Sequence, residues 1–209
     1  MVLYPDSDAV LAALGDKVVD AFAAAVARTR EDLTAYRSAN PLWVAEASER
    51  GLAGWIHDRL WAALVELLNL NPDVYLFESG PTRDVIVTDR FRIRVKRHDL
   101  AGNVASYPTQ GAFEFFAQPS IPTFDDMDQV HLVAGYCWTK DLRDIGAAVM
   151  SLRDGKFNVI WLTDLDARAA ARAGTIGVAP TPISPEIDTP VAPVIELAVS
   201  EDAGIEESS

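Results

Sequence analysis

The strongest chemical signal in this sequence is a cluster of positive charges between residues 83 and 97. Only Asp84 and Asp89 oppose six cations there, in a chain whose net charge is −13. Alternation along residues 91–96 predicts a strand whose apolar side chains face a core and whose cations face outward. The apolar set is Phe91, Ile93 and Val95. The six cations, which include the outward set, are Arg83, Arg90, Arg92, Arg94, Lys96 and Arg97.

This basic stripe predicts a binding surface for a negatively charged partner. An acidic protein surface, nucleic-acid phosphates and the protein's own acids would each complement it. The net charge opposes nucleic acid through long-range repulsion, and no helix-turn-helix, zinc-finger or aromatic RNA-binding motif accompanies the stripe. The alternative is a solvated face, because cations also keep outer strands soluble. We therefore expect a protein partner first and nucleic acid second.

A second candidate binding surface follows on a short helix that Pro108 is predicted to open. Gln110, Glu114 and Gln118 are spaced by four residues and share one helical face. Phe113 and Phe116 lie on the opposite, apolar side. The polar face is either solvated or lines a recognition groove beside the basic strand.

The order of elements around the basic strand resembles the core of the restriction-endonuclease-like PD-(D/E)xK nucleases. In that family, acids on the second and third strands hold a divalent cation beside a lysine. For a nuclease, the resemblance implies Glu66, Asp84 and Lys96 as catalytic residues. Arg94 replaces the metal-binding acid of the third strand, and its charge would repel the cation. We expect no catalysis, metal or cofactor; the alternatives are a degenerate nucleic-acid-binding scaffold and, third, an active nuclease.

Other catalytic signatures are absent from the sequence. His57, His98 and His131 have no paired metal-ligand spacing. No nucleophile elbow, phosphate-binding glycine loop or dinucleotide fingerprint occurs. Cys137 lies within an apolar strand and is interpreted as a small buried hydrophobe.

Three stretches resemble a group of uncharacterised bacterial proteins: RIRVKRHDLAGNVASYPTQGAFEFFAQ, VHLVAGYCW and FNVIWLTDL. Members of that group are encoded beside helix-turn-helix regulators, some with a zinc-peptidase-like domain. Such neighbourhoods are typical of toxin–antitoxin, prophage or stress-response modules. The resemblance implies a regulatory protein that binds a partner such as a helix-turn-helix regulator, and it carries over no catalytic residue.

The periodicity of the chain predicts the elements that position these residues. An i, i+4 apolar stripe predicts a helix from Ser7 to Tyr36, and Asn40-Pro41 starts a second helix that Gly51 and Gly54 divide. Six runs then predict strands, at residues 74–77, 84–88, 91–96, 130–138, 145–152 and 157–162. The result is an α+β fold, ααβββαβββ, with two N-terminal antiparallel helices packed on a largely antiparallel sheet of about six strands.

Composition predicts one domain over residues 1–164 and a disordered tail over residues 165–209. The tail holds eight acids, two arginines and five of the twelve prolines, so a packed element is not expected there. Its apolar motif, residues 191–199, is either a linker end or a docking motif. No apolar run is long enough to span a membrane and no signal peptide is recognised, so we expect a cytoplasmic protein.

Overall fold

The computed structural model describes residues 4–106, 109–117 and 129–175 of the 209-residue chain. Its helices before the sheet are α1 (Ser7–Leu14), α2 (Asp16–Ala39), α3 (Pro41–Glu46) and α4 (Glu49–Leu68). The first strands are β1 (Val74–Ser79), β2 (Thr82–Val87) and β3 (Phe91–His98), followed by α5 (Gln110–Phe116). The last elements are β4 (Val130–Thr139), β5 (Asp144–Arg153), β6 (Val159–Asp164) and α6 (Leu165–Thr175). No helix among the described residues is long and apolar enough to cross a membrane.

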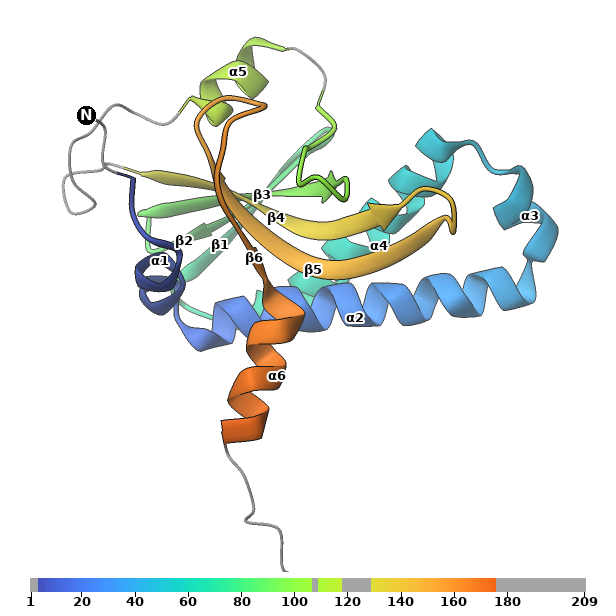
Figure 1. The fold of residues 1–209 in the computed structure, drawn as a ribbon, viewed down its shortest axis with the longest axis horizontal. Coiled ribbons are helices and arrows are strands. Elements are labelled where there is room, and N and C mark those ends of the chain that lie inside the picture. Colours follow the sequence, from blue (N-terminus) through green and yellow to red (C-terminus); the bar gives the residue numbers. More distant parts are fainter. Residues whose placement is uncertain (1–3, 107–108, 118–128, 176–209) are drawn as a thin grey trace, which may run out of the picture. The chain divides into compact units, whose positions relative to one another are not determined.

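The six strands form one sheet in the order of the sequence, β1 to β6. Every neighbouring pair is antiparallel except β3 and β4, which run parallel. A parallel pair needs a crossover rather than a tight turn, and α5 lies in that connection. In Figure 1, α5 lies above the sheet and α2 below it, while α4 runs back along α2. The predicted α+β fold is confirmed.

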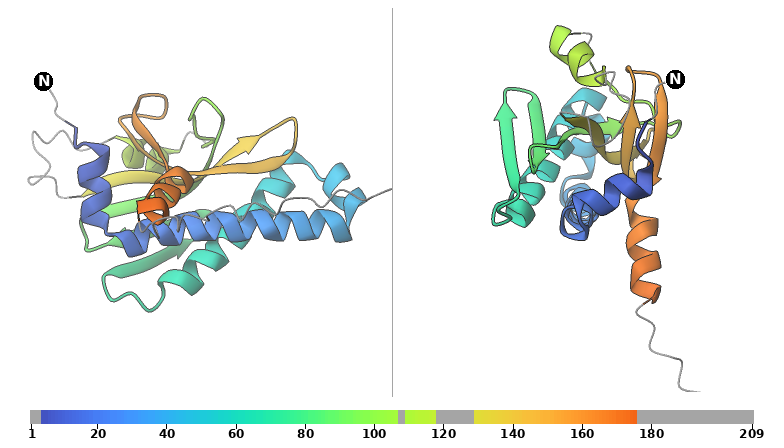
Figure 2. Two further views of the ribbon diagram at one scale, coloured as in Figure 1. Left: turned by 60° about the horizontal axis from the view of Figure 1, so that its bottom comes forward. Right: turned by 90° about the vertical axis from the view of Figure 1, so that its left-hand side faces the viewer.

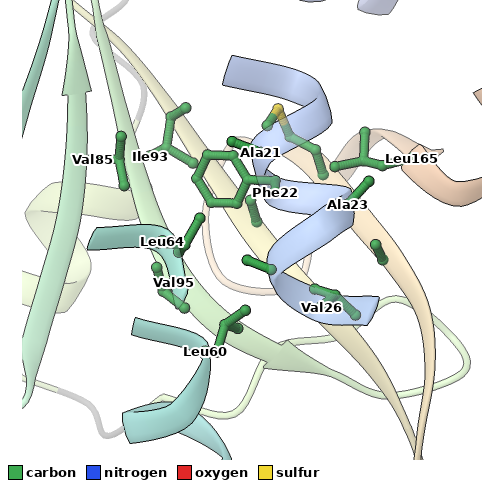
Figure 3. Packing of buried hydrophobic residues seen from close by; sticks show 14 of the residues in the cluster. Ala21, Phe22, Ala23, Val26, Leu60, Leu64, Val85, Ile93, Val95 and Leu165 are labelled. Atoms are coloured by element: carbon green, nitrogen blue, oxygen red, sulfur yellow. The ribbon is translucent and has the colours of Figure 1, made fainter. Parts of the chain in front are cut away.

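The core lies between the sheet and the helices α2 and α4 (Figure 3). Phe22 of α2 and Leu64 of α4 are 1% and 0% exposed, and they pack in one cluster with the inward side chains of β3. Those side chains are Phe91, Ile93 and Val95, as the alternation predicts, and each is at most 1% exposed. The even-numbered residues of β3 therefore project to the face of the sheet that α2 and α4 leave uncovered.

The helix boundaries differ from the predicted ones where local capping decides. Asp6, not Ser7, caps α1 and accepts hydrogen bonds from the backbone of its first turn. Gly15, at φ +81°, separates α1 from α2. The second predicted helix is divided before Ser48 rather than at the glycines, because Ser48 Oγ caps α4 by accepting from Gly51 N–H at 3.0 Å.

The predicted domain boundary after residue 164 falls before α6, which packs against α2 and β5 and extends the described fold to Thr175. Leu165 is 1% exposed and belongs to the core. Asp166 accepts hydrogen bonds from Ala148 N–H and from Arg30, each at 3.1 Å. The acids and prolines of the tail lie mostly beyond this helix, so composition averaged over the tail concealed it. The motif at residues 191–199 lies outside the described residues.

Removing α6 should destabilise the domain, whereas removing the chain beyond it should not. A chain ending at Asp164 loses the burial of Leu165, which contributes about 2 kcal/mol, as well as the contacts of Asp166. A chain ending at Ile176 keeps every contact described above. Urea unfolding of both truncated chains tests this expectation. Equal stability of the two would show that α6 adds nothing to the fold.

A buried polar cluster supports the face of the sheet opposite α2. His98 is 0% exposed, and its Nε2 lies 3.2 Å from Ser151 Oγ. Arg153 is 1% exposed; it donates to Ser151 Oγ at 3.1 Å and to the carbonyl oxygens of Gly102 and Lys156. Burial, together with the charge of Arg153, lowers the pKa of His98 to about 3. His98 is therefore neutral in the folded protein at neutral pH.

Acidification should destabilise the fold through His98. Between pH 6.5 and 3 the unfolded chain binds a proton at this residue that the folded chain does not, so stability decreases as the pH decreases. At pH 5 the loss from this residue amounts to about 2 kcal/mol. The variant His98→Gln keeps a neutral hydrogen-bonding side chain, so it should lose less stability than the wild type between pH 7 and 5. Urea titrations at both pH values measure the difference, and equal losses would contradict the prediction.

Candidate functional site

A groove of about 500 Å³ lies between α5 and the face of the sheet that α2 and α4 leave uncovered. We call it the β3–α5 groove. Strand β3 contributes its outward cations, and β1, β2, β4 and α5 contribute the walls. The lining residues are Phe77, Ser79, Pro81, Thr82, Arg92, Arg94, Lys96, Ser106, Thr109, Gly111, Ala112, Glu114, Phe115 and His131.

Asp84 of β2 organises the cations of this groove. Its carboxylate is 0% exposed and lies opposite Arg94 in the antiparallel register of β2 and β3. Arg94 donates to both carboxylate oxygens, from Nε at 2.8 Å and from Nη2 at 3.0 Å. Arg92 Nε donates to the same carboxylate at 2.7 Å. Arg94 is 9% exposed and is held inside the protein by a charge-assisted pair, so at this position one of the protein's own acids complements the basic stripe.

Aromatic side chains complete the floor of the groove. The guanidinium carbon of Arg94 lies 3.8 Å from the ring centroid of Phe115, and that ring stacks on His131 at 4.9 Å. His131 Nδ1 donates to the carbonyl oxygen of Phe115 at 2.8 Å, which ties α5 to β4. Arg92 lies over Phe77, with 5.6 Å between its guanidinium carbon and the ring centroid. No pattern in the sequence indicated that Phe77, Phe115 and His131 would line this groove.

Helix α5 presents a different apolar face from the predicted one. Phe113 is 60% exposed, whereas Phe115 and Phe116 are buried. Thr109 caps the helix by accepting from Ala112 N–H at 3.2 Å, so α5 begins after Thr109 rather than at Pro108. The cap and the buried aromatic residues position this short helix of 7 residues. The spacing of its residues alone does not determine how the helix is rotated about its own axis.

Lys96 is the groove cation for which the described part of the chain provides no ion-pair partner. Its side chain is half-buried, and no hydrogen bond or ion pair joins it to any residue that the structure describes. Burial lowers the pKa of Lys96, and the charge of Arg94 lowers it further while Asp84 opposes the change. A partly desolvated ammonium group without a counter-ion favours an anionic ligand at this position.

The remaining predicted binding residues are distributed unevenly around the groove. Gln110 Nε2 donates to Glu114 Oε1 at 2.8 Å, so these two share a face as predicted, and Glu114 lines the groove. Gln118 lies outside the described residues. Arg90 lies over the ring of Phe91, outside the groove. Arg97 also lies outside it and stacks on Trp138, with 5.8 Å from its guanidinium carbon to the ring centroid.

The residues implied by the nuclease resemblance do not assemble. Glu66 projects from α4, on the helical side of the sheet, where it pairs with Arg28. Asp84 and Lys96 lie on the opposite side, and the carboxylate of Asp84 is occupied by two arginines. Within the described ranges, no group of three His, Cys, Asp or Glu residues could hold a metal ion.

Comparisons with known proteins give no match: no protein-family model fits this chain, and no curated protein or solved structure is significantly similar to it. The chemistry of the groove is therefore the basis on which its function is interpreted. That chemistry combines fixed arginines, an unpartnered lysine and aromatic walls, which suit the binding of an anion with apolar groups attached.

Removing the charge of the Asp84 carboxylate should destabilise the whole domain. Asp84→Asn leaves Arg94 buried without a counter-charge, and such a change costs about 3–5 kcal/mol. Replacing both partners, as in Asp84→Leu with Arg94→Met, should restore most of that stability because no buried charge remains. Urea unfolding of the two variants tests the coupling. If Asp84→Asn stays within about 0.5 kcal/mol of the wild type, the pair does not stabilise the fold.

Proposed function

We propose that this chain is a non-enzymatic, regulatory protein-binding module whose β3–α5 groove holds an acidic segment of a partner protein. The observation that carries the proposal is Lys96, a half-buried cation that forms no hydrogen bond or ion pair with any described residue. Keeping an unpaired charge partly desolvated lowers stability. A counter-charge supplied by a partner would remove that penalty on binding.

The walls of the groove favour a peptide over a small inorganic anion. Phe77 and Phe115 provide apolar surface beside the cations, so acidic and apolar side chains of one segment could be bound together. A volume of about 500 Å³ is in the range of sites that enclose several such groups. Arg92 and Arg94 are held in position by Asp84, which reduces the ordering entropy lost when a carboxylate binds.

Nucleic acid is the second candidate, because the same cations suit phosphates. Asp84 already neutralises part of their charge, and Glu114 adds an acid to the lining. The net charge of −13 opposes the approach of a polyanion of any length. These features favour a short acidic segment. The bacterial resemblance makes a helix-turn-helix regulator encoded nearby the first partner protein to test.

Removing the charge of Arg92 or of Lys96 should weaken binding without unfolding the protein. The probe is a fluorescein-labelled peptide, Glu-Phe-Glu-Leu-Glu-Leu-Glu, with its glutamine analogue as the uncharged control. We expect Arg92→Gln and Lys96→Gln each to weaken binding about tenfold, which corresponds to about 1.4 kcal/mol. Arg50→Gln, which removes an exposed cation of α4, is the matched control and should leave the affinity unchanged. Fluorescence anisotropy measures the dissociation constants.

A stability measurement separates a binding role for Lys96 from a structural one. Lys96→Met replaces an unpaired, half-buried charge by an apolar chain of similar length, so thermal stability should rise while peptide binding weakens. Equal peptide binding by the wild type and both groove variants would reject the proposal. Tighter binding of a single-stranded oligonucleotide, with affinity falling steeply as salt increases, would favour the nucleic-acid alternative.

A further inference from the structure

We infer that the acidic segment binds in an extended form along β3, in a track that continues from the β3–α5 groove into two further hollows. The recognised ligand is then an unfolded stretch of about six residues with acids at intervals, rather than a compact acidic surface. This inference rests on the proposed function and specifies the form of its ligand.

The track exists because the ladder between β2 and β3 is shorter than β3. Strand β2 pairs with β3 only from Phe91 to Arg94. The next pairing on that side is the isolated bridge between His98 and Val104. Residues 95–97 pair with β4 on their other side, and within the described ranges no strand pairs with them here. The sheet is therefore open beside Lys96, at the end of the β1–β2 hairpin.

Two hollows continue from this opening. The second hollow, of about 240 Å³, shares Pro81 and Lys96 with the groove but extends to the helical side of the sheet, where Gly54 and His57 of α4 line it. The third, of about 290 Å³, shares Arg97 and Ala105 with the second. A cation of β3 thus lies at each junction. From Arg92 towards the C-terminal end of β3, the groove comes first, the second hollow next and the third hollow last.

Unpartnered donors in the third hollow are an independent reason to place an acceptor there. Arg97 Nη1 and Trp138 Nε1 are buried, and the described part of the chain offers neither of them a hydrogen-bond partner. Both residues line this hollow, and both groups can only donate. Buried polar groups are rarely left unsatisfied in native proteins. A carboxylate of the ligand would supply the missing acceptor.

The spacing of the cations determines the length of the segment. Arg92 and Arg97 are five positions apart on a strand, so they project to opposite faces of β3 and the segment passes the open edge of the sheet between them; their separation along the strand corresponds to about 17 Å at about 3.3 Å per residue. A peptide running beside β3 in extended form rises by the same amount per residue, so about six residues reach both cations. A three-residue peptide can contact the groove but not the third hollow.

A comparison of peptide lengths tests the track. The long probe is the labelled Glu-Phe-Glu-Leu-Glu-Leu-Glu peptide, and the short probe is its first three residues with the same label. We expect the wild type to bind the long probe at least about tenfold more tightly. Ala105 is exposed and lines the second and third hollows, so Ala105→Glu adds a repelling charge without disturbing the core. It should weaken long-probe binding at least about fivefold and leave short-probe binding unchanged; Ala105→Gln is the matched control.

The outcomes distinguish this inference from the proposed function. Groove binding of both probes with equal affinity, sensitive to Arg92→Gln but not to Ala105→Glu, would overturn the extended track and leave the groove function standing. Tighter binding of the long probe that Ala105→Glu does not weaken would also overturn the track, because the added contacts would lie elsewhere. Binding of neither probe would overturn both proposals. Arg97→Gln provides a second test, since it should weaken only the long probe.

Discussion

The candidate site depends on the buried carboxylate of Asp84. It neutralises the charge of Arg94 where water cannot, and it accepts a hydrogen bond from Arg92 at the same time. Without it, two adjacent guanidinium groups on one strand would repel each other within a partly desolvated groove. The position of Phe115, and with it the place of α5, then follows from its stacking on Arg94. One acid on β2 therefore determines the shape of a site that is formed mainly by β3 and α5. Figure 2 shows α5 on the side of the sheet away from α2.

The site separates two roles that the cations of β3 could share. Arg94 is fixed and buried, whereas the side chain of Lys96 is partly exposed and forms no hydrogen bond or ion pair with a described residue. Arg92 is intermediate, since it pairs with Asp84 while still lining the groove. Conservation of charge at these positions would therefore have different causes. If the proposed function holds, binding would select for Lys96, stability for Arg94, and both for Arg92.

The sequence was sufficient to predict the six strands and most of the helical residues but not the contacts between the elements. Alternation along β3 predicted which side chains face the core, because a strand has only two faces. It could not reveal that Asp84 lies opposite Arg94, since that register depends on how two strands align. The prediction of the buried side of α5 was also wrong at Phe113. Phe113, Phe115 and Phe116 are all apolar, so only packing determines which of them are buried. Helix α6 was missed because its few helical residues were averaged with the prolines that follow.

The parallel pairing of β3 with β4 has a consequence for the order of folding. The antiparallel strands β1 to β3 are joined by short turns, so they can form early from local contacts. Pairing Phe91 with Val130 instead closes a loop of about forty residues, which makes β4 a late addition to the sheet. His131, which anchors α5, arrives with that strand. We therefore expect the newly made chain to pass through a stage in which the arginines of β3 are still uncovered, and at that stage an acidic partner would meet a wider and less selective surface than the finished groove.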